Sequence, residues 1–397
     1  MGEQDPDIMS IEEQLTQLKE AFNAKYGSAP THAAVAPGRV NLIGEHTDYN
    51  AGFVCPIAIE RQTMIVAKPN GTNTVNVNSI GMEDFPGQFE ISEDLTQGEP
   101  EWVNYVKGVV FGCLKRGINP GGFDAYLSST VPLGSGLSSS AALEVCVATL
   151  LADLADAELG VTDKALLCQK AEHDFANMPC GIMDQYISAG GEEGCAMLLD
   201  CRTNTPEHVR LNDPSVAVLI INSNVKHKLS GSEYPQRRQQ CEEAAKILGV
   251  ESLRDATIEQ LQAAMDKMDP VVYKRAKHVI GEIKRTAEAA KLMEQNQWVA
   301  VGEHMYDSHE TLSRDFEVST KELDLLVQLA QSIGTAGGVY GSRMTGGGFG
   351  GCTVSLVEAE KANTISEQIC KTYMEQTGIE PAAFVTRPAQ GARVISV

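Results

Sequence analysis

The sequence predicts an α+β fold in two halves. Short β-rich runs separated by Gly, Pro and Asn fill residues 32–80, whereas residues 232–333 follow an almost continuous helical pattern. At 397 residues the chain is long enough for two hydrophobic cores. We therefore expect an N-terminal domain with a mixed sheet at 1–210. A helix-rich C-terminal domain with an antiparallel sheet would follow at 211–397, and the chain ends could pair back across this boundary.

The first predicted element is a helix that Ser10 and Glu13 open with a capping box and that Gly27 ends. The other N-terminal elements are hairpins over 32–80, a strand over 122–130, helices at about 141–156 and 162–176, and strands at 196–199 and 216–221. Thr162 would cap the second of these helices.

The second half begins with several helices, because polar breaks near 249, 270 and 296 interrupt the helical pattern. Leu323 and Leu326 mark one apolar face of the last of them. The tail is predicted as a strand over 352–358, a helix over 360–376, and strands over 381–386 and 393–397.

Composition excludes several classes of function. A net charge of −21 argues against nucleic-acid binding and against an anionic membrane surface. The acidic N-terminus does not resemble a secretory signal, and no apolar stretch is long enough to span a bilayer. Ten cysteines without a C-x-x-C pair indicate free thiols in the cytoplasm. The histidines have no metal-ligand spacing with these cysteines, so we expect no zinc site.

Residues 131–145, VPLGSGLSSSAALEV, combine a glycine turn with the start of a helix. Gly134 and Gly136 permit close backbone approach, and the free N–H groups of a helix start favour phosphate. The alternative is a plain turn followed by a serine N-cap. A P-loop is excluded because no Lys follows a Gly. The G-x-G-x-x-G at Gly346 leads into a predicted strand, which excludes a dinucleotide fold.

Residues 38–50, GRVNLIGEHTDYN, gather polar side chains in a short stretch. Glu45, His46 and Asp48 could all face one small polar ligand from a loop. The alternative is a surface loop whose salt bridges satisfy one another. A metal site at His46 and Asp48 is less favoured, because no further ligand cluster accompanies them.

Two further stretches suggest functional positions. Asp184, in CGIMDQ, has apolar neighbours, so its carboxylate requires a partner such as an Arg that keeps it ionised. An ordinary helix cap is the alternative. Residues 342–356, SRMTGGGFGGCTVSL, place five glycines around Phe349. We interpret them as a loop that closes on substrate, against the alternative of a glycine-rich bend.

These stretches resemble the motifs of the GHMP small-molecule kinases. Residues 131–145 resemble the central phosphate motif, residues 342–356 the third motif, and residues 38–50 the signature of the galactokinase group. The resemblance extends over about 34–397. It implies transfer of the γ-phosphoryl group of ATP to the anomeric hydroxyl of α-D-galactose. The product would be galactose 1-phosphate, in the first step of galactose catabolism.

The resemblance also implies a role for each matching residue. Asp184 would be the catalytic base, and Arg39 its charge partner and transition-state stabiliser. The sugar would be bound by Arg39, Glu45, His46, Asp48, Gly181, Asp184 and Tyr234. The phosphates of ATP would be bound by Gly134, Gly136, Ser138 and Ser139, and its adenine would be bordered by Trp102 and Tyr105. Mg²⁺ would be bound by Ser140 and Glu172.

Three alternatives stay open. An N-acetylgalactosamine kinase would need room beside the sugar C2, and residues 38–50 with the SEYPQRR run at 232–238 favour galactose instead. A non-catalytic galactose-sensing regulator would have a damaged phosphate loop, but Ser140, Asp184 and Arg39 are all in place. A kinase of mevalonate or homoserine would not need the polar run that starts at Glu45. We expect a monomer whose partners are the sugar and ATP.

Overall fold

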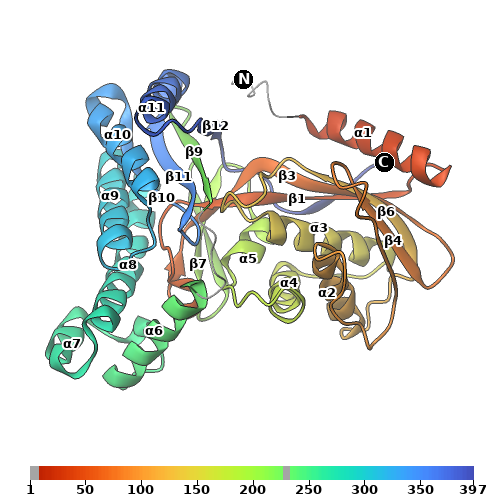
Figure 1. Ribbon diagram of the computed structural model, residues 1–397, viewed down its shortest axis with the longest axis horizontal. Coiled ribbons are helices and arrows are strands. Elements are labelled where there is room, and N and C mark those ends of the chain that lie inside the picture. The colour runs from red at the N-terminus through yellow and green to blue at the C-terminus, as the bar shows by residue number, and fades with distance from the viewer. Residues whose placement is uncertain (1–8, 227–232) are drawn as a thin grey trace.

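A six-stranded sheet forms the centre of the N-terminal half in the computed structural model, which describes residues 9–226 and 233–397 (Figure 1). Its order is β13-β1-β3-β6-β4-β5, and all neighbours are antiparallel except β4 and β6. The strands are β1 His32–Asn41, β3 Pro56–Pro69, β4 Thr74–Ser79, β5 Gly87–Glu90, β6 Phe123–Ser129 and β13 Arg393–Ile395. Because β13 pairs with β1, the end of the chain returns to the N-terminal sheet.

Helices cover both faces of this sheet (Figure 1). Helix α1 (Ile11–Tyr26) packs Leu18 and Phe22 against one face, and its capping box and the left-handed Gly27 are as predicted. The other face is covered by α2 (Val103–Leu114), α3 (Ser139–Leu154) and α4 (Val161–Phe175), followed by α5 (Met183–Gly190). Buried apolar side chains from both layers form the core between them.

A smaller three-stranded sheet lies between the main sheet and the helix-rich half. Its strands are β2 Phe53–Val54, β7 Cys195–Asp200 and β8 Thr205–Arg210, in that order. The next strand, β9, belongs to a different sheet, so the chain leaves the N-terminal half between β8 and β9.

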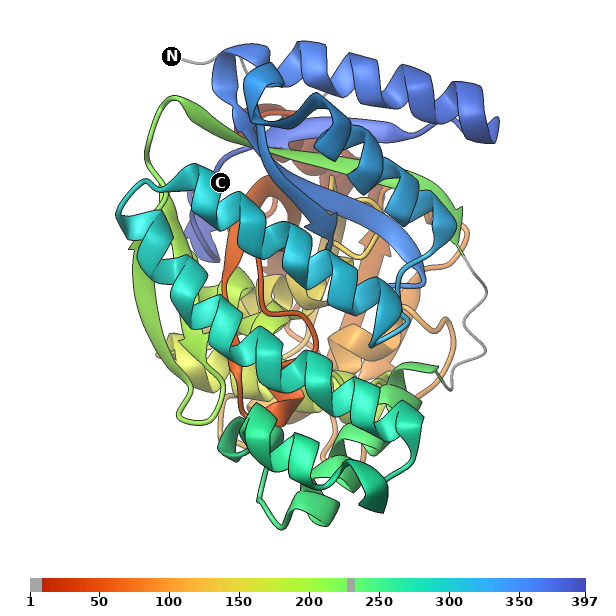
Figure 2. The same ribbon diagram turned by 90° about the vertical axis from the view of Figure 1, so that its left-hand side faces the viewer.

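The C-terminal half combines an antiparallel sheet with long helices (Figure 2). The sheet order is β10-β11-β9-β12, and its strands are β9 Val216–Lys226, β10 Val339–Met344, β11 Gly350–Glu358 and β12 Ala382–Thr386. The helices are α6 Glu233–Leu248, α7 Ile258–Ala263, α8 Pro270–Glu294, α9 Trp298–Arg314, α10 Lys321–Gly337 and α11 Ala362–Thr377. Helices α10 and α11 pack on one face, while α8 and α9 contribute to the core on the other.

Three sequence expectations were wrong. Helix α4 starts at Val161 after an extended Gly160, and the Thr162 hydroxyl hydrogen-bonds Tyr186 instead of capping the helix. Residues 32–80 are not a series of hairpins, because β6 lies between β3 and β4 and pairs with β4 in parallel. The last strand ends at residue 395 rather than 397. Ser232 and the acidic residues 3–7 lie outside the described residues.

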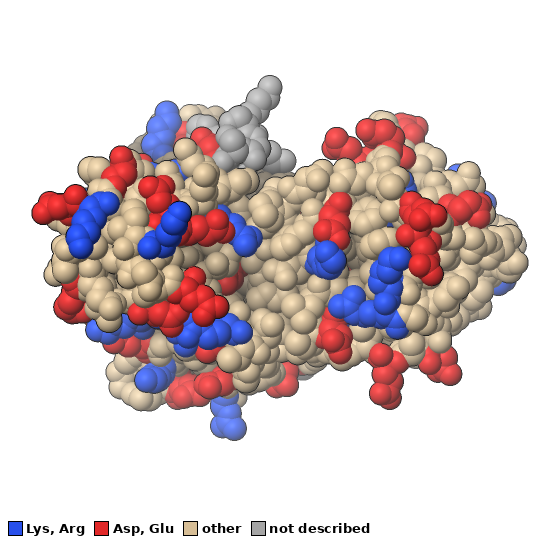
Figure 3. Space-filling view, turned by 90° about the horizontal axis from the view of Figure 1, so that it is seen from below, with Lys and Arg blue, Asp and Glu red and all other residues tan. Residues whose placement is uncertain are grey.

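Acidic and basic side chains are interspersed over both lobes of the face seen in Figure 3, and the waist between the lobes carries few of them. Within the described residues, no helix has both the length and the apolar character needed to cross a bilayer.

Candidate active site

The ion pair between Arg39 and Asp184 joins two elements that are far apart in the sequence. Arg39 lies on β1, and Asp184 lies in the first turn of α5. The guanidinium donates to both carboxylate oxygens, with Nε–Oδ1 at 2.8 Å and Nη2–Oδ2 at 2.7 Å. Its remaining nitrogen donates to the carbonyl oxygen of Gly136. The Asp184 carboxylate is therefore held by a two-point charge pair rather than used as a helix cap.

Ser138 connects the glycine loop to this ion pair. It occupies the N-cap position of α3 with a left-handed backbone, φ 60°, and its side chain makes no capping hydrogen bond. The hydroxyl instead donates to Oδ2 of Asp184. The serine N-cap interpretation of this loop was therefore wrong. Among the described residues, no side chain caps the start of α3, which leaves its first N–H groups available to an anion.

Neighbouring carboxylates keep Arg39 in its ionised form despite its burial. Desolvation alone would lower its pKa, but attraction from Asp184, followed by Glu45, outweighs this and raises the pKa above the ordinary value. The Arg39 residue is 5% exposed, so its guanidinium remains charged in a largely water-free setting. Such a fixed charge is suited to stabilising negative charge that develops nearby during a reaction.

A polar cavity of about 150 Å³ opens beside the ion pair. All seven predicted sugar-binding residues line it, together with Glu172 of the predicted metal pair. The full lining is Arg39, Glu45, His46, Asp48, Glu172, Met178, Cys180, Gly181, Met183, Asp184, Tyr234, Gly346 and Gly347. Sequence motifs spread over 300 residues thus meet at one small cavity.

Asp48 and Gly181 both line this cavity and lie in direct contact with each other. A Cβ atom on Gly181 would lie 1.7 Å from Oδ2 of Asp48, so only glycine fits there. Asp48 opens a short 3₁₀ turn, and its Oδ1 accepts the N–H of Tyr49 at 3.0 Å. Burial, with repulsion from Asp184, raises the pKa of Asp48 to about 7. Its carboxylate therefore needs hydrogen-bond donors from a ligand to stay charged at low cost.

His46 presents one unused ring nitrogen. Its Nδ1 shares a hydrogen bond of 2.8 Å with the Tyr49 hydroxyl, while its buried Nε2 has no partner among the described residues. Burial lowers the pKa of His46 to about 3, so the ring is neutral and one nitrogen can donate while the other accepts. Tyr234 lies beside it, with ring centroids 5.5 Å apart.

Glu45 is held by the third glycine motif. Its Oε1 accepts the N–H of Gly346 at 2.7 Å and the hydroxyl of Thr345 at 3.1 Å, with Arg343 at 3.4 Å. Residues 44–47 are all buried, which contradicts the surface-loop interpretation of this stretch.

Glu282 is a residue of this site that sequence reasoning missed. It lies in α8, is fully buried, and its Oε1 accepts the N–H of Gly44 at 2.9 Å and the hydroxyl of Ser308 at 2.7 Å. Burial would raise its pKa, but Arg285 and the other cations nearby lower it to about 2. The sequence signal that could have identified Glu282 was a carboxylate on the apolar face of a predicted helix.

The third glycine motif also touches the phosphate loop. A Cβ atom on Gly346 would lie 2.9 Å from the carbonyl oxygen of Gly136, and one on Gly351 would lie 2.6 Å from that of Ser135. Both glycines have positive φ, 83° in each case. The motif is thus a tight turn between β10 and β11 that packs on both predicted ligand loops.

Glu172 lines the cavity, and Ser140 lies in the first turn of α3. Glu172 accepts from Gln185 Nε2 at 2.6 Å, and Ser140 lies close enough to lower its pKa. Burial, with repulsion from Asp184, raises the pKa of Glu172 to about 7, and Oε1 of the buried Glu144 nearby has no hydrogen-bond partner within the part of the chain that the structure describes. A hydroxyl beside crowded carboxylates fits a hard divalent cation, which prefers oxygen ligands.

The two predicted adenine residues do not line the cavity. Trp102 donates from Nε1 to the carbonyl oxygen of Phe85 at 3.0 Å. Tyr105 is half-buried, and burial with repulsion from Glu172 raises its pKa to about 12. All four predicted ATP-binding residues, Gly134, Gly136, Ser138 and Ser139, also lie outside the cavity lining, as does Ser140; they belong to the loop and the first turn of α3.

Comparison with known proteins agrees with this arrangement. The galactokinase galactose-binding signature matches residues 20–69, the GHMP kinase N-terminal domain residues 104–192, and the GHMP kinase C-terminal domain residues 289–375. Galactokinases of Homo sapiens and Bos taurus are each 46% identical; the human alignment covers 97% of both chains, and the bovine one 96% of this chain and 97% of its own.

Solved structures show the same relationship. The Lactococcus lactis galactokinase complexed with galactose superposes with a TM-score of 0.91 at 33% identity, over 96% of this chain and 99% of its own. Methanococcus jannaschii mevalonate kinase reaches a TM-score of 0.65 at 18% identity, over 92% of this chain and 100% of its own, which shows a common fold. On these matches, the chain belongs to the galactokinase family of the GHMP kinases.

Proposed function

We propose that this protein transfers the γ-phosphoryl group of ATP to the anomeric hydroxyl of α-D-galactose, giving galactose 1-phosphate and ADP. Family membership supports this reaction. The observation that carries the proposal is the position of Asp184, which borders the polar cavity and is tied through Arg39 and Ser138 to the phosphate loop. A sugar hydroxyl in the cavity and a phosphate at the helix start would meet at this carboxylate.

Asp184 is proposed as the group that accepts the proton of the anomeric hydroxyl. Its two hydrogen bonds to Arg39 fix the direction of the carboxylate, and Ser138 fixes it from the side of the phosphate loop. Arg39 would then stabilise the charge that develops on the transferring group. Both residues come from regular elements, which gives the pair a defined geometry.

The other cavity residues are proposed to read the sugar hydroxyls. Asp48 supplies acceptor oxygens, the neutral His46 supplies one nitrogen, and Tyr234 supplies a ring and a hydroxyl. Glu45, braced by Gly346, holds its oxygens in place, and Gly181 leaves the space that Asp48 needs.

The nucleotide is proposed to bind at the phosphate loop. Gly134, Gly136, Ser138 and Ser139 would contact its phosphates through backbone N–H and hydroxyl groups. Trp102 and Tyr105 stay predictions for the adenine border. Ser140 and Glu172 would hold Mg²⁺, which when bound would neutralise phosphate charge.

The direct test is an assay of ADP formation with ATP, Mg²⁺ and a panel of acceptors. We expect galactose to exceed glucose by at least about 100-fold in kcat/KM, because a moved hydroxyl leaves buried polar groups unpaired. Preferred turnover of N-acetylgalactosamine would instead support an N-acetylgalactosamine kinase. Galactose binding without turnover would support a sensing regulator, and preferred turnover of mevalonate or homoserine another GHMP kinase.

Three broader features belong to the same proposal. The domain boundary near 210/211 fits the change of sheet between β8 and β9. A cytoplasmic location fits the ten free cysteines. A monomer remains the expected state, and sedimentation of the purified chain would test it.

A further inference from the structure

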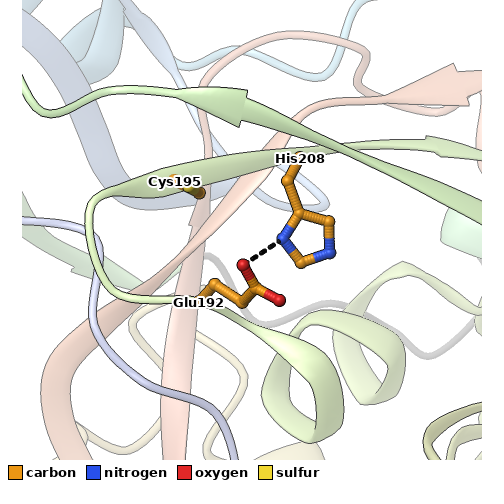
Figure 4. A group of neighbouring side chains, drawn as sticks. All are labelled: Glu192, Cys195 and His208. Carbon is orange, nitrogen blue, oxygen red and sulfur yellow. Dashed lines mark ion pairs between the residues drawn. The ribbon is translucent and has the colours of Figure 1, made fainter.

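Glu192, Cys195 and His208 bring a carboxylate, a thiol and an imidazole to one point outside the cavity (Figure 4). One donor atom from each residue lies within 4.8 Å of the other two. Glu192 follows α5, while Cys195 and His208 lie on the neighbouring strands β7 and β8. Asp184 begins α5 and this cluster follows its end, which separates the two by about 12 Å of helix.

Strand register explains why these residues meet. In the β7–β8 ladder, Cys195 pairs with Arg210 and Met197 pairs with His208. Side chains two residues apart on a strand share a face, so Cys195 and His208 are diagonal neighbours on the same face. The spacing of thirteen residues along the chain shows no metal motif, which is why the sequence predicted no zinc site.

The backbone holds the third donor close to the other two. The N–H of Cys195 donates to the carbonyl oxygen of Glu192 at 3.1 Å, which closes a tight turn. Gly194 in this turn has φ 73°, and its N–H donates to the carbonyl oxygen of Pro388 at 3.0 Å. The Glu192 carboxylate is already oriented toward the ring, with Oε2 2.8 Å from Nδ1 of His208 (Figure 4).

We propose that Glu192, Cys195 and His208 form a zinc-binding site. Sulfur, nitrogen and carboxylate oxygen are the ligands that Zn²⁺ takes, whereas Mg²⁺ and Ca²⁺ prefer oxygen alone. Donor atoms on a tetrahedral zinc ion lie up to about 4 Å apart, so the observed cluster needs only small side-chain shifts. Three protein ligands leave a fourth position for water.

The test measures Zn²⁺ binding to the nucleotide-free, chelator-treated protein in excess Mg²⁺, which keeps Zn²⁺ from the oxygen ligands of Ser140 and Glu172. We expect one equivalent to bind to the wild type. Cys195→Ser and His208→Ala should each weaken Zn²⁺ binding at least roughly tenfold. Replacing a residue that only hydrogen-bonds a metal ligand already lowers metal affinity by that factor, and these two variants remove a ligand itself. Cys370→Ser and His304→Ala are matched controls that should leave the affinity unchanged.

Two further readouts complete the test. Co²⁺ in place of Zn²⁺ should give a thiolate-to-metal absorption band that Cys195→Ser abolishes and Cys370→Ser retains. Bound Zn²⁺ should raise the Tm of the wild type but not that of His208→Ala, because a ligand that binds only the folded state stabilises it. Binding that is absent, or equal in the wild type and both ligand variants, would overturn the proposal. Because neither ligand variant touches the cavity, sugar turnover can fail or succeed independently of this result.

Discussion

The sugar loop, residues 42–50, and the phosphate loop, residues 131–138, meet at Asp184 but are supported very differently. The sugar loop is buried and braced from the C-terminal half, where Glu282 accepts the N–H of Gly44 and Gly346 donates to Glu45. The phosphate loop is open, and its Leu133 side chain is 67% exposed. The braced sugar loop thus lines the cavity itself, whereas the phosphate loop reaches it through the hydrogen bonds of Ser138 to Asp184 and of Arg39 to Gly136.

The difference follows from what each loop has to recognise. Sugar hydroxyls differ only in direction, so the groups that read them must be fixed before the sugar arrives. Phosphate is recognised by charge and by backbone N–H groups, which a glycine turn at a helix start supplies without side-chain bracing. We infer that selectivity is built into the braced loop, while the open loop allows nucleotide exchange.

The largest expected effect is at the point where the two loops meet. Asp184→Asn should lower kcat by roughly 10²–10⁴, the usual range for a positioned proton acceptor. Galactose should still bind, because Asn has the same shape and the sugar loop is braced independently of Asp184. Steady-state kinetics and calorimetric titration with galactose on the same samples would measure both. A fully active variant would place the base elsewhere.

The Arg39→Ala variant tests the other member of the Arg39–Asp184 ion pair. Its loss of kcat should be large and far from additive with that of Asp184→Asn, because the two side chains act as one unit through two hydrogen bonds. Additive losses in the double variant would show that Arg39 acts separately.

Paired glycine substitutions compare the two loops directly. Gly181→Ala would drive a Cβ atom into Asp48, so we expect the galactose KM to rise about 5- to 150-fold, the equivalent of 1–3 kcal/mol of overpacking. Gly136→Ala meets only the Thr345 carbonyl oxygen, at 3.6 Å, but must adopt φ 81°. It should weaken ATP and leave the galactose KM nearly unchanged. Equal effects of both variants on both substrates would remove the distinction between the loops.

Glu282→Gln tests the bracing from α8. The N–H of Gly44 would exchange a charged acceptor for a neutral one, which corresponds to roughly a 5- to 30-fold rise in galactose KM. Glu322→Gln is the control, because Glu322 is another buried carboxylate of the C-terminal half and lies on α10. If both variants lost Tm alike and neither changed the galactose KM, Glu282 would be only structural.

The last expected effect is a pH-dependent difference in stability, rather than in activity, at Asp48. Its folded-state pKa is raised to about 7 from 3.8, so between these values the folded protein holds a proton that the unfolded chain has lost. Stability from this group therefore falls as pH rises. The Tm of Asp48→Asn relative to wild type should increase from about pH 5 to about pH 8.

Asp213 provides the control for that titration. Hydrogen bonds from Ser215 lower its pKa below 3.8, so its carboxylate is charged in both folded and unfolded states across this range. The Tm difference of Asp213→Asn should stay constant between about pH 5 and about pH 8. A constant difference for Asp48→Asn as well would contradict the raised pKa of Asp48.

Local sequence patterns predicted local structure well. The capping box at Ser10, the left-handed Gly27 and the division into a mixed-sheet half and a helical half all follow from residues close in sequence. The failure that changed the topology depended on distant pairing: the parallel ladder of β4 with β6 joins residues 48 positions apart, such as Val75 and Phe123, and nothing local marks it.

The residues of the candidate site also divide into those that the sequence could predict and those that it could not. Arg39 and Asp184 could be expected to pair because a carboxylate among apolar residues needs a partner. Glu282 could not be placed, since its partner is a backbone N–H of a loop that only the tertiary fold brings to α8. The cluster of Glu192, Cys195 and His208 could not be predicted for a related reason, because strand register rather than sequence spacing brings Cys195 next to His208.

The central claim is that selectivity for galactose resides in a site already formed before nucleotide binds. Calorimetric titration of galactose and of glucose into the nucleotide-free protein tests it most directly. We predict saturable one-to-one binding of galactose and no measurable binding of glucose at the same concentrations. Galactose binding that appears only after nucleotide is added, or equal binding of both sugars, would contradict the account.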